Sequence, residues 1–240
     1  MHLGQARLCA PWLSFLTLPS QEHAPRGFVL SAEEVNRNYF REAYRTGVLG
    51  WGTEGPSPCA VAFLERARMQ VPGGTLLDAG CGEGRHCFAA RGLGFKVTGI
   101  DLEPMALNRA RCLARRNHVA GIRFLEANVY SLPFPGSAFD VVLDYGCLHH
   151  QRKSDWQAYK AEVLRVLKPR GLYILSVFSP RFRFFRAGRR SWHIAHGAYR
   201  RCFAPQEISG LFGREFEILE LMEEEGEARG FWHALMKRQG

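Results

Sequence analysis

From residue 75 onward, short apolar runs of strand character alternate with longer segments whose apolar residues recur at helical spacing. The predicted strands cover residues 75–79, 95–101, 122–127, 139–144 and 171–177. The predicted helices between them cover residues 83–92, 104–117 and 154–167. Alternation of this kind predicts an α/β fold, a doubly wound and mostly parallel sheet with helices on both faces.

The two ends of the chain depart from this alternation. Residues 1–30 hold several breakers and predict an irregular extension. Two helical patterns follow within residues 31–72, and because they precede the first strand we expect an N-terminal helical cap. The main domain, residues 73–240, ends in a helix and a predicted antiparallel hairpin, which brings the sheet to seven strands. It also carries an insertion over residues 178–204.

The most specific pattern lies where the first predicted strand ends. Residues 75–84 read Thr-Leu-Leu-Asp-Ala-Gly-Cys-Gly-Glu-Gly, so the glycine spacing is Gly-x-Gly-x-Gly. A strand that ends in such a turn lets a ligand approach bare backbone N–H groups. Asp78 lies in the strand end, where it could organise the turn. Asp101 ends the second strand 19 residues after Gly82. In α/β nucleotide sites, the acid that binds the ribose follows the glycine turn at about this spacing along the chain.

This combination resembles the class I S-adenosylmethionine (SAM)-dependent methyltransferases over residues 75–178, and more weakly to residue 237. The resemblance implies a Rossmann-like fold, SAM as cofactor, and methyl transfer that releases S-adenosylhomocysteine. It places Gly80, Cys81 and Gly82 at the methionine end of SAM and Asp101 at its ribose. The further cofactor-binding residues that it implies are Trp51, Asp78, Leu102, Asn128, Val129 and Tyr145.

Asn128 departs from the family pattern, because this position usually holds an acid that contacts the adenine amino group. The side-chain oxygen of an asparagine can still accept that hydrogen bond. The alternative is that Asn128 only ends a strand and turns the chain. The run Tyr-Phe-Arg-Glu-Ala-Tyr over residues 39–44, followed by Trp51 between two glycines, resembles the lid of thiopurine and tellurite-resistance methyltransferases. Trp51 could lie near the sulfonium, to which an aromatic face is attractive.

The end of the fourth strand and its loop carry the candidate catalytic residues. Because ligands lie beyond the carboxyl ends of such strands, we expect Asp144 and Tyr145 to face the transferred methyl group. The sequence Asp-Tyr-Gly-Cys here differs from the Asn/Asp-Pro-Pro-Tyr of base methylases and resembles the small-molecule branch. His149 is a candidate base because its ordinary pKa is near neutrality, or it packs the loop. Tyr145 is the second candidate.

Charge and composition leave the methyl acceptor open. The 240-residue chain has a net charge of +9, and residues 178–203 mix seven arginines with aromatic residues and lack acids. This insertion could clamp an anionic small molecule, bind single-stranded RNA or DNA, or be a solvated loop. The alternatives to small-molecule methylation are therefore nucleic-acid methylation and a SAM-binding regulatory protein without turnover.

Seven scattered cysteines without a Cys-x-x-Cys pair predict neither a disulfide framework nor a zinc site, and no metal is expected. The uncharged stretch over residues 8–21 is too short to span a bilayer and contains two prolines. We therefore expect a cytoplasmic protein without a membrane partner. The oligomeric state and the acceptor's identity do not follow from the sequence.

Overall fold

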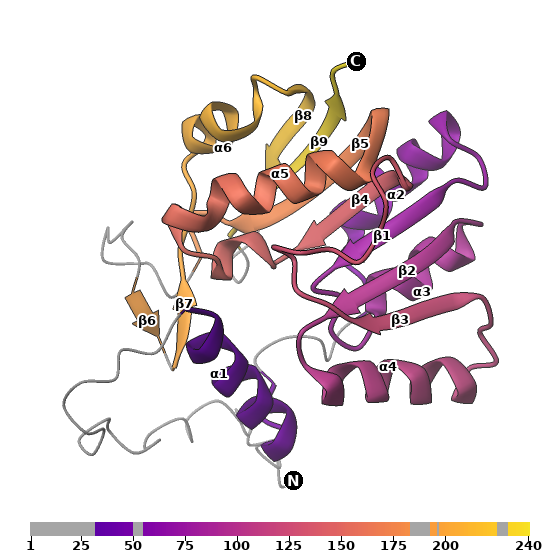
Figure 1. The fold of residues 1–240 in the computed structure, drawn as a ribbon, viewed down its shortest axis with the longest axis vertical. Helices are drawn as coiled ribbons and strands as arrows, with labels where there is room; N and C mark the ends of the chain where they lie inside the picture. The colour runs from indigo at the N-terminus through magenta and orange to yellow at the C-terminus, as the bar shows by residue number, and fades with distance from the viewer. Residues whose placement is uncertain (1–31, 50–54, 183–192, 196, 225–229) are drawn as a thin grey trace, which may run out of the picture.

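The computed structural model describes residues 32–49, 55–182, 193–195, 197–224 and 230–240. Its centre is a seven-stranded sheet of order β3-β2-β1-β4-β5-β9-β8 (Figure 1). The strands are β1 (Thr75–Ala79), β2 (Lys96–Asp101), β3 (Ile122–Glu126), β4 (Phe139–Tyr145), β5 (Leu167–Phe178), β8 (Phe216–Glu223) and β9 (Phe231–Arg238). Strand β9 runs antiparallel to β5 and β8, whereas the other pairs are parallel. The predicted doubly wound sheet with a closing hairpin is confirmed.

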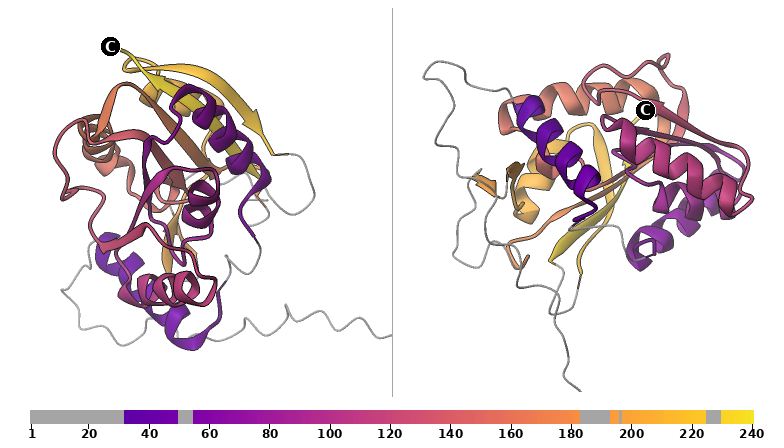
Figure 2. Two further views of the ribbon diagram at one scale, coloured as in Figure 1. Left: turned by 90° about the vertical axis from the view of Figure 1, so that its right-hand side faces the viewer. Right: turned by 90° about the horizontal axis from the view of Figure 1, so that it is seen from below.

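Helices cover both faces of the sheet (Figure 2). On one face lie α2 (Pro58–Gln70), α3 (Arg85–Gly92) and α4 (Pro104–Arg116), and on the other lie α5 (Trp156–Val166) and α6 (Pro205–Phe212). Successive strand residues point to opposite faces. Val141 and Leu143 therefore join the core beneath α2, α3 and α4, while Val142 joins the core beneath α5 and α6. A strand that is covered on both faces therefore contributes side chains to both cores.

The starts of two helices differ from the sequence prediction for local reasons. Helix α3 begins at Arg85 because Gly84 precedes it with φ +82°, a left-handed conformation that suits glycine. Helix α5 begins at Trp156 because residues 153–155 form a 3₁₀ turn. The helix thus starts two residues after the predicted residue 154, and the Ser154 hydroxyl donates to Asp155.

The two helices predicted within residues 31–72 occupy different places. Helix α2 packs against α3, β5 and β9, so it belongs to a covering layer of the sheet. Helix α1 (Ala32–Thr46) lies at the carboxyl edge of the parallel strands (Figure 1), where it contacts β7 (Ala198–Arg200) and α4. Strand β7 pairs with β6 (His193–Ala195) in a small second sheet. It also contacts the 3₁₀ turn η1 (Leu148–His150) that follows β4.

Candidate functional site

The glycine turn between β1 and α3 is the centre of the candidate site. Gly80 and Gly82 have φ values of +74° and +55°, which side chains disfavour. The turn is held by the N–H of Cys81, which donates to the carbonyl of Ile100 at 2.8 Å. A methyl group added at Gly80 would lie 3.0 Å from Cβ of Cys147. Glycine at this position therefore lets the loop after β4 approach the turn closely.

Asp101 closes the other side of the turn. Its Oδ2 accepts a hydrogen bond of 2.8 Å from the N–H of Gly82, and its Oδ1 accepts one of 2.9 Å from the N–H of Glu103. Burial raises the pKa of the carboxyl above its usual value although these N–H groups lower it. The structure thus brings together the two features that the sequence pattern singled out, and it presents a carboxylate where hydroxyl donors could bind.

Asp78 lies beneath the turn and is buried. Burial raises its pKa to about 7, against a lowering effect of the Cys87 thiol, which donates to Oδ2 at 3.1 Å. Asp144 and Asp101 raise this pKa further. The turn is therefore underlain by a carboxyl that changes charge near neutral pH and that a cation nearby would favour as the anion.

The two residues at the end of β4 do not face the same side. Asp144 is fully buried and accepts hydrogen bonds from the Tyr159 hydroxyl at 2.6 Å and from the N–H of Cys147 at 2.6 Å. Asp144 orients the loop after β4, so the expectation that it faces the methyl group is wrong. The Tyr145 ring points to the opposite face, 4.5 Å from the ring of His86 and 5.3 Å from that of Phe231.

His149 is buried in packing contacts. Its ring stacks on Phe178 with centroids 3.6 Å apart, and its Nδ1 accepts from the N–H of Phe178 at 3.3 Å. Burial lowers the pKa of His149 well below its usual value, and His150 and Arg200 lower it further. His150 has the same character, with Nδ1 2.6 Å from the carbonyl of Tyr199. These contacts favour the packing role over the role of a base.

Asn128 links the candidate adenine position to α1. Its Nδ2 donates to Glu33 at 3.1 Å, and its Oδ1 accepts from the N–H of Tyr130 at 2.9 Å. Val129 is buried in the core beside it, and Leu102 follows Asp101 half-buried. These side-chain bonds of Asn128 agree with an asparagine that turns the chain after a strand.

The docking of α1 on this edge could not be found from the sequence. Asn36 donates to the carbonyl of His150 at 2.7 Å and accepts from the N–H of Tyr199 at 2.9 Å. A Cβ added at Gly82 would lie 3.2 Å from the hydroxyl oxygen of Tyr44, so Tyr44 packs closely over this glycine. One polar and one aromatic residue of α1 thus cover the glycine turn and η1, although both fit an ordinary core pattern in sequence.

The arginine-rich insertion is described in part. Trp51 and residues 183–192, with four of the arginines, lie outside the described residues. Arg181 pairs with Glu223 at 3.3 Å, and Arg201 pairs with Glu207. Arg200 is buried and donates to the Tyr39 hydroxyl at 2.7 Å. These arginines contact the fold itself.

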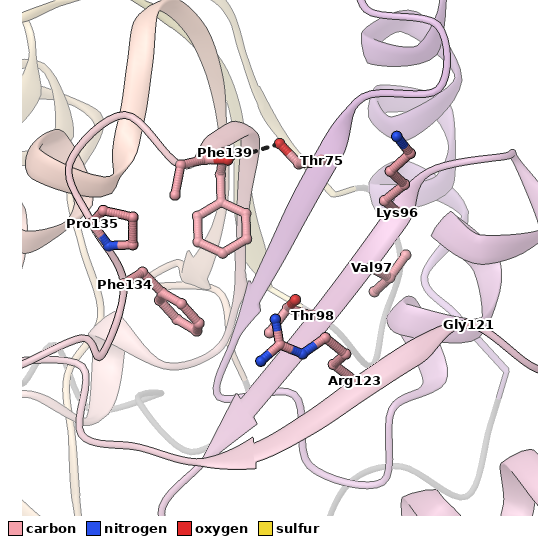
Figure 3. A pocket seen from close by; sticks show the side chains of 10 residues that line it. Thr75, Lys96, Val97, Thr98, Gly121, Arg123, Phe134, Pro135 and Phe139 are labelled. Atoms are coloured by element: carbon pink, nitrogen blue, oxygen red, sulfur yellow. Dashed lines mark hydrogen bonds between the residues drawn. The ribbon is translucent and has the colours of Figure 1, made fainter.

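A cavity of about 320 Å³ lies at the opposite edge of the sheet, where the parallel strands begin (Figure 3). Thr75, Lys96 and Phe139 stand around it. It is therefore not part of the site around Gly80 and Asp101. In the described ranges, no helix combines the length and apolar character that a membrane crossing needs.

The matching family model and two similar curated proteins are methyltransferases. A family model described as "Methyltransferase domain" matches residues 76–171. The fatty-acid O-methyltransferase of Mycolicibacterium smegmatis is 30% identical over 171 residues, which are 70% of this chain and 54% of that protein. A demethylmenaquinone methyltransferase of Tropheryma whipplei is 35% identical over 127 residues, 51% of each chain. The chain spans about half the length of these curated relatives.

One solved structure matches almost end to end. The 1,6-didemethyltoxoflavin-N1-methyltransferase of Burkholderia thailandensis, solved with its acceptor and S-adenosylhomocysteine bound, has a TM-score of 0.72 to this chain. It is 24% identical, and the match covers 91% of this chain and 93% of that one. This likeness shows that the two chains share a fold.

Proposed function

Because the chain belongs to the class I S-adenosylmethionine-dependent methyltransferases, a family of enzymes whose cofactor is SAM, we propose that it methylates a small molecule and releases S-adenosylhomocysteine. The observation that carries the proposal is the hydrogen bond from the Gly82 N–H to the Asp101 carboxylate. It sets a bare glycine turn and a hydroxyl-binding carboxylate side by side, at the strand edge where α/β folds bind nucleotides.

The residues at this edge fit SAM. Asp101 has the carboxylate oxygens that can accept hydrogen bonds from the ribose hydroxyls. The turn at Gly80, Cys81 and Gly82 would lie against the methionine part, since its glycines place no Cβ between backbone and ligand. Asn128 and Val129, with Leu102, would line the adenine. Asp78 beneath the turn would favour a positively charged ligand.

Methyl transfer from this site depends mainly on alignment. When bound, SAM supplies a methyl group on a sulfonium that a nucleophilic atom of the acceptor can take directly. The residues around the glycine turn and Tyr145 would hold the two reactants in line, which can supply much of the acceleration. His149 holds the loop by stacking on Phe178, and we propose no proton transfer through it. Tyr145 lines the side from which the acceptor approaches.

The acceptor that this edge suits best is a flat molecule with an anionic group. Phe178, Phe182 and Phe231 form an aromatic cluster with Tyr145 where β4 and β5 end and β9 begins. Aromatic faces favour flat ligands. Arg200 adds positive charge close enough to lower the pKa of both His149 and His150. One relative is named for a fatty-acid acceptor and one solved neighbour for 1,6-didemethyltoxoflavin.

Calorimetric titration of the full chain with SAM tests the cofactor site. Asp101→Asn should weaken SAM binding by roughly ten- to a hundredfold, because a charge-assisted hydrogen bond contributes about 1.5–3 kcal/mol. The matched control is Glu126→Gln, which removes the exposed acid at the end of the neighbouring strand and should bind SAM like the natural chain. Equal affinities for all three proteins would contradict the role of Asp101.

A further inference from the structure

Three potential metal ligands meet beside β9. The thiol sulfur of Cys59, a carboxylate oxygen of Glu224 and a ring nitrogen of His233 all lie within 4.8 Å of one another. Cys59 is in the first turn of α2, Glu224 directly follows β8, and His233 is in β9. The cluster therefore joins three elements that are far apart in the sequence.

Two of the three donor atoms are buried without a hydrogen bond. Glu224 Oε2 and His233 Nε2 have no hydrogen-bond partner among the described residues, and the His233 side chain is fully buried. Buried polar atoms without a partner destabilise a fold unless a ligand satisfies them. The two atoms lie 3.6 Å from each other. Two ligands of a tetrahedral zinc ion with bonds of about 2.0–2.1 Å lie roughly 3.3 Å apart, so the observed spacing is close to that of a ligand pair.

The histidine is oriented by a second residue. Its Nδ1 lies 2.8 Å from the hydroxyl oxygen of Ser176, which is the partner of His233 across the β5–β9 pairing. With the proton on Nδ1, the ring donates to Ser176 and turns the lone pair of Nε2 toward Cys59 and Glu224. Metal-binding histidines commonly have an outer partner of this kind.

The charges of the cluster also suit a cation. The fully buried His233 ring can bind a cation through the lone pair of Nε2 without adding charge. A divalent ion nearby would favour the thiolate form of Cys59. One thiolate and one carboxylate then balance two positive charges.

We propose that Cys59, Glu224 and His233 bind a zinc ion. Sulfur, nitrogen and carboxylate ligands together are typical of zinc, whereas magnesium and calcium prefer oxygen alone. Spacing along the chain predicts no zinc site, because the three residues do not form a local motif. Three protein ligands leave one coordination position open. The His233 ring is 6.1 Å from that of Tyr145, so the ion would border the proposed acceptor side.

The test uses the full chain, freed of metal and kept in a phosphine reductant that does not bind zinc. Zinc is titrated in competition with a chromophoric chelator. The natural chain should bind one zinc ion at this cluster. Cys59→Ser should weaken the binding by more than about a hundredfold, since loss of an outer partner alone costs ten- to a hundredfold. Cys112→Ser, which removes an exposed thiol elsewhere, should bind as the natural chain does.

Cobalt provides a spectroscopic readout that is independent of affinity. The natural chain and Cys112→Ser should show a thiolate-to-cobalt charge-transfer band, and Cys59→Ser should lack it. Glu224→Gln should keep the band but bind more weakly. Unfolding in chelator checks that the variants are folded. Absence of zinc binding in the natural chain would overturn the proposal, as would natural affinity in both Cys59→Ser and Glu224→Gln.

Discussion

The backbone N–H of Gly82 donates to Asp101 Oδ2 at 2.8 Å, although the two residues come from different βα units. The bond orients the carboxylate toward the glycine turn. Since Oδ1 is held by the N–H of Glu103, the side chain is fixed at both oxygens. A ligand with vicinal hydroxyls therefore meets an acceptor that is already oriented, which reduces the entropy lost on binding.

The glycine turn predicts a contrast between two alanine substitutions. Gly80→Ala and Gly94→Ala both place a side chain at positive φ, +74° and +92°, so both should lose about 1–2 kcal/mol of stability. Only at Gly80 does the new methyl group meet a neighbour, Cys147, whereas nothing lies within 4 Å at Gly94. SAM titration should show lost binding for Gly80→Ala alone. Equal SAM affinity in both variants would contradict a role of this turn.

Asp78 predicts a pH-dependent stability. Its pKa in the folded chain is raised by burial from 3.8 to about 7. Between these values the unfolded chain is ionised while the folded chain keeps the proton, so the natural protein loses stability as pH rises. Asp78→Asn removes this loss. Relative to the natural chain, its free energy of unfolding should increase by about 2–3 kcal/mol from pH 5 to pH 8.

Asp140→Asn is the control for this experiment. Burial acts to raise the pKa of Asp140, but bonds from Lys168 and Thr75 outweigh it, and the pKa is lowered. Asp140 is then ionised in both states above pH 5, so its effect should not vary between pH 5 and pH 8. Urea unfolding at both pH values measures the difference. If the free energy of unfolding of Asp78→Asn, relative to the natural chain, were the same at both pH values, the pKa of Asp78 in the natural chain would not be raised.

Asn36 predicts how α1 is held. Its amide satisfies the carbonyl of His150 and the N–H of Tyr199, so Asn36→Ala leaves both groups without this partner at a cost of about 1–3 kcal/mol. Hydrogen exchange at the Tyr199 amide should accelerate. Asn38→Ala, on the exposed side of the same helix, should leave it unchanged. Similar exchange rates in the two variants would mean that other contacts hold α1.

His149 should stay neutral throughout the physiological range. Burial lowers its pKa well below the usual value, and its Nδ1 accepts from the N–H of Phe178. Nuclear magnetic resonance of the ring should therefore show no titration of His149 between pH 5.5 and 8. A titration with a midpoint near 6.5 would contradict the packing and restore His149 as a candidate base.

Local sequence patterns predict most of the fold and the glycine turn of the candidate cofactor site. The strand ends and glycines of residues 75–84 predict their own geometry, because positive φ and strand periodicity are properties of neighbouring residues. Their place at a strand end favours both Asp144 and Tyr145 at the transfer site, but adjacent strand residues point to opposite faces. Asp144 instead accepts a hydrogen bond from the Tyr159 hydroxyl.

Contacts between distant segments leave no local pattern in the sequence. The hydrogen bonds of Asn36 to η1 and β7 join residues that are 114 and 163 positions apart in the sequence. Local periodicity cannot predict contacts at such separations. The same holds for Cys59 and His233, which come together only because α2 packs on β9. Side-chain chemistry assembled from three elements has no signature in the spacing of one sequence.

Turnover measures the central claim most directly. The purified chain is incubated with SAM carrying a labelled methyl group and a cell extract split into a small-molecule fraction and a nucleic-acid fraction. We expect S-adenosylhomocysteine release and label transfer with the small-molecule fraction, unchanged by nuclease and abolished by Gly80→Ala. Transfer of the label to the nucleic-acid fraction alone, or SAM binding with no release of S-adenosylhomocysteine from either fraction, would contradict methylation of a small molecule.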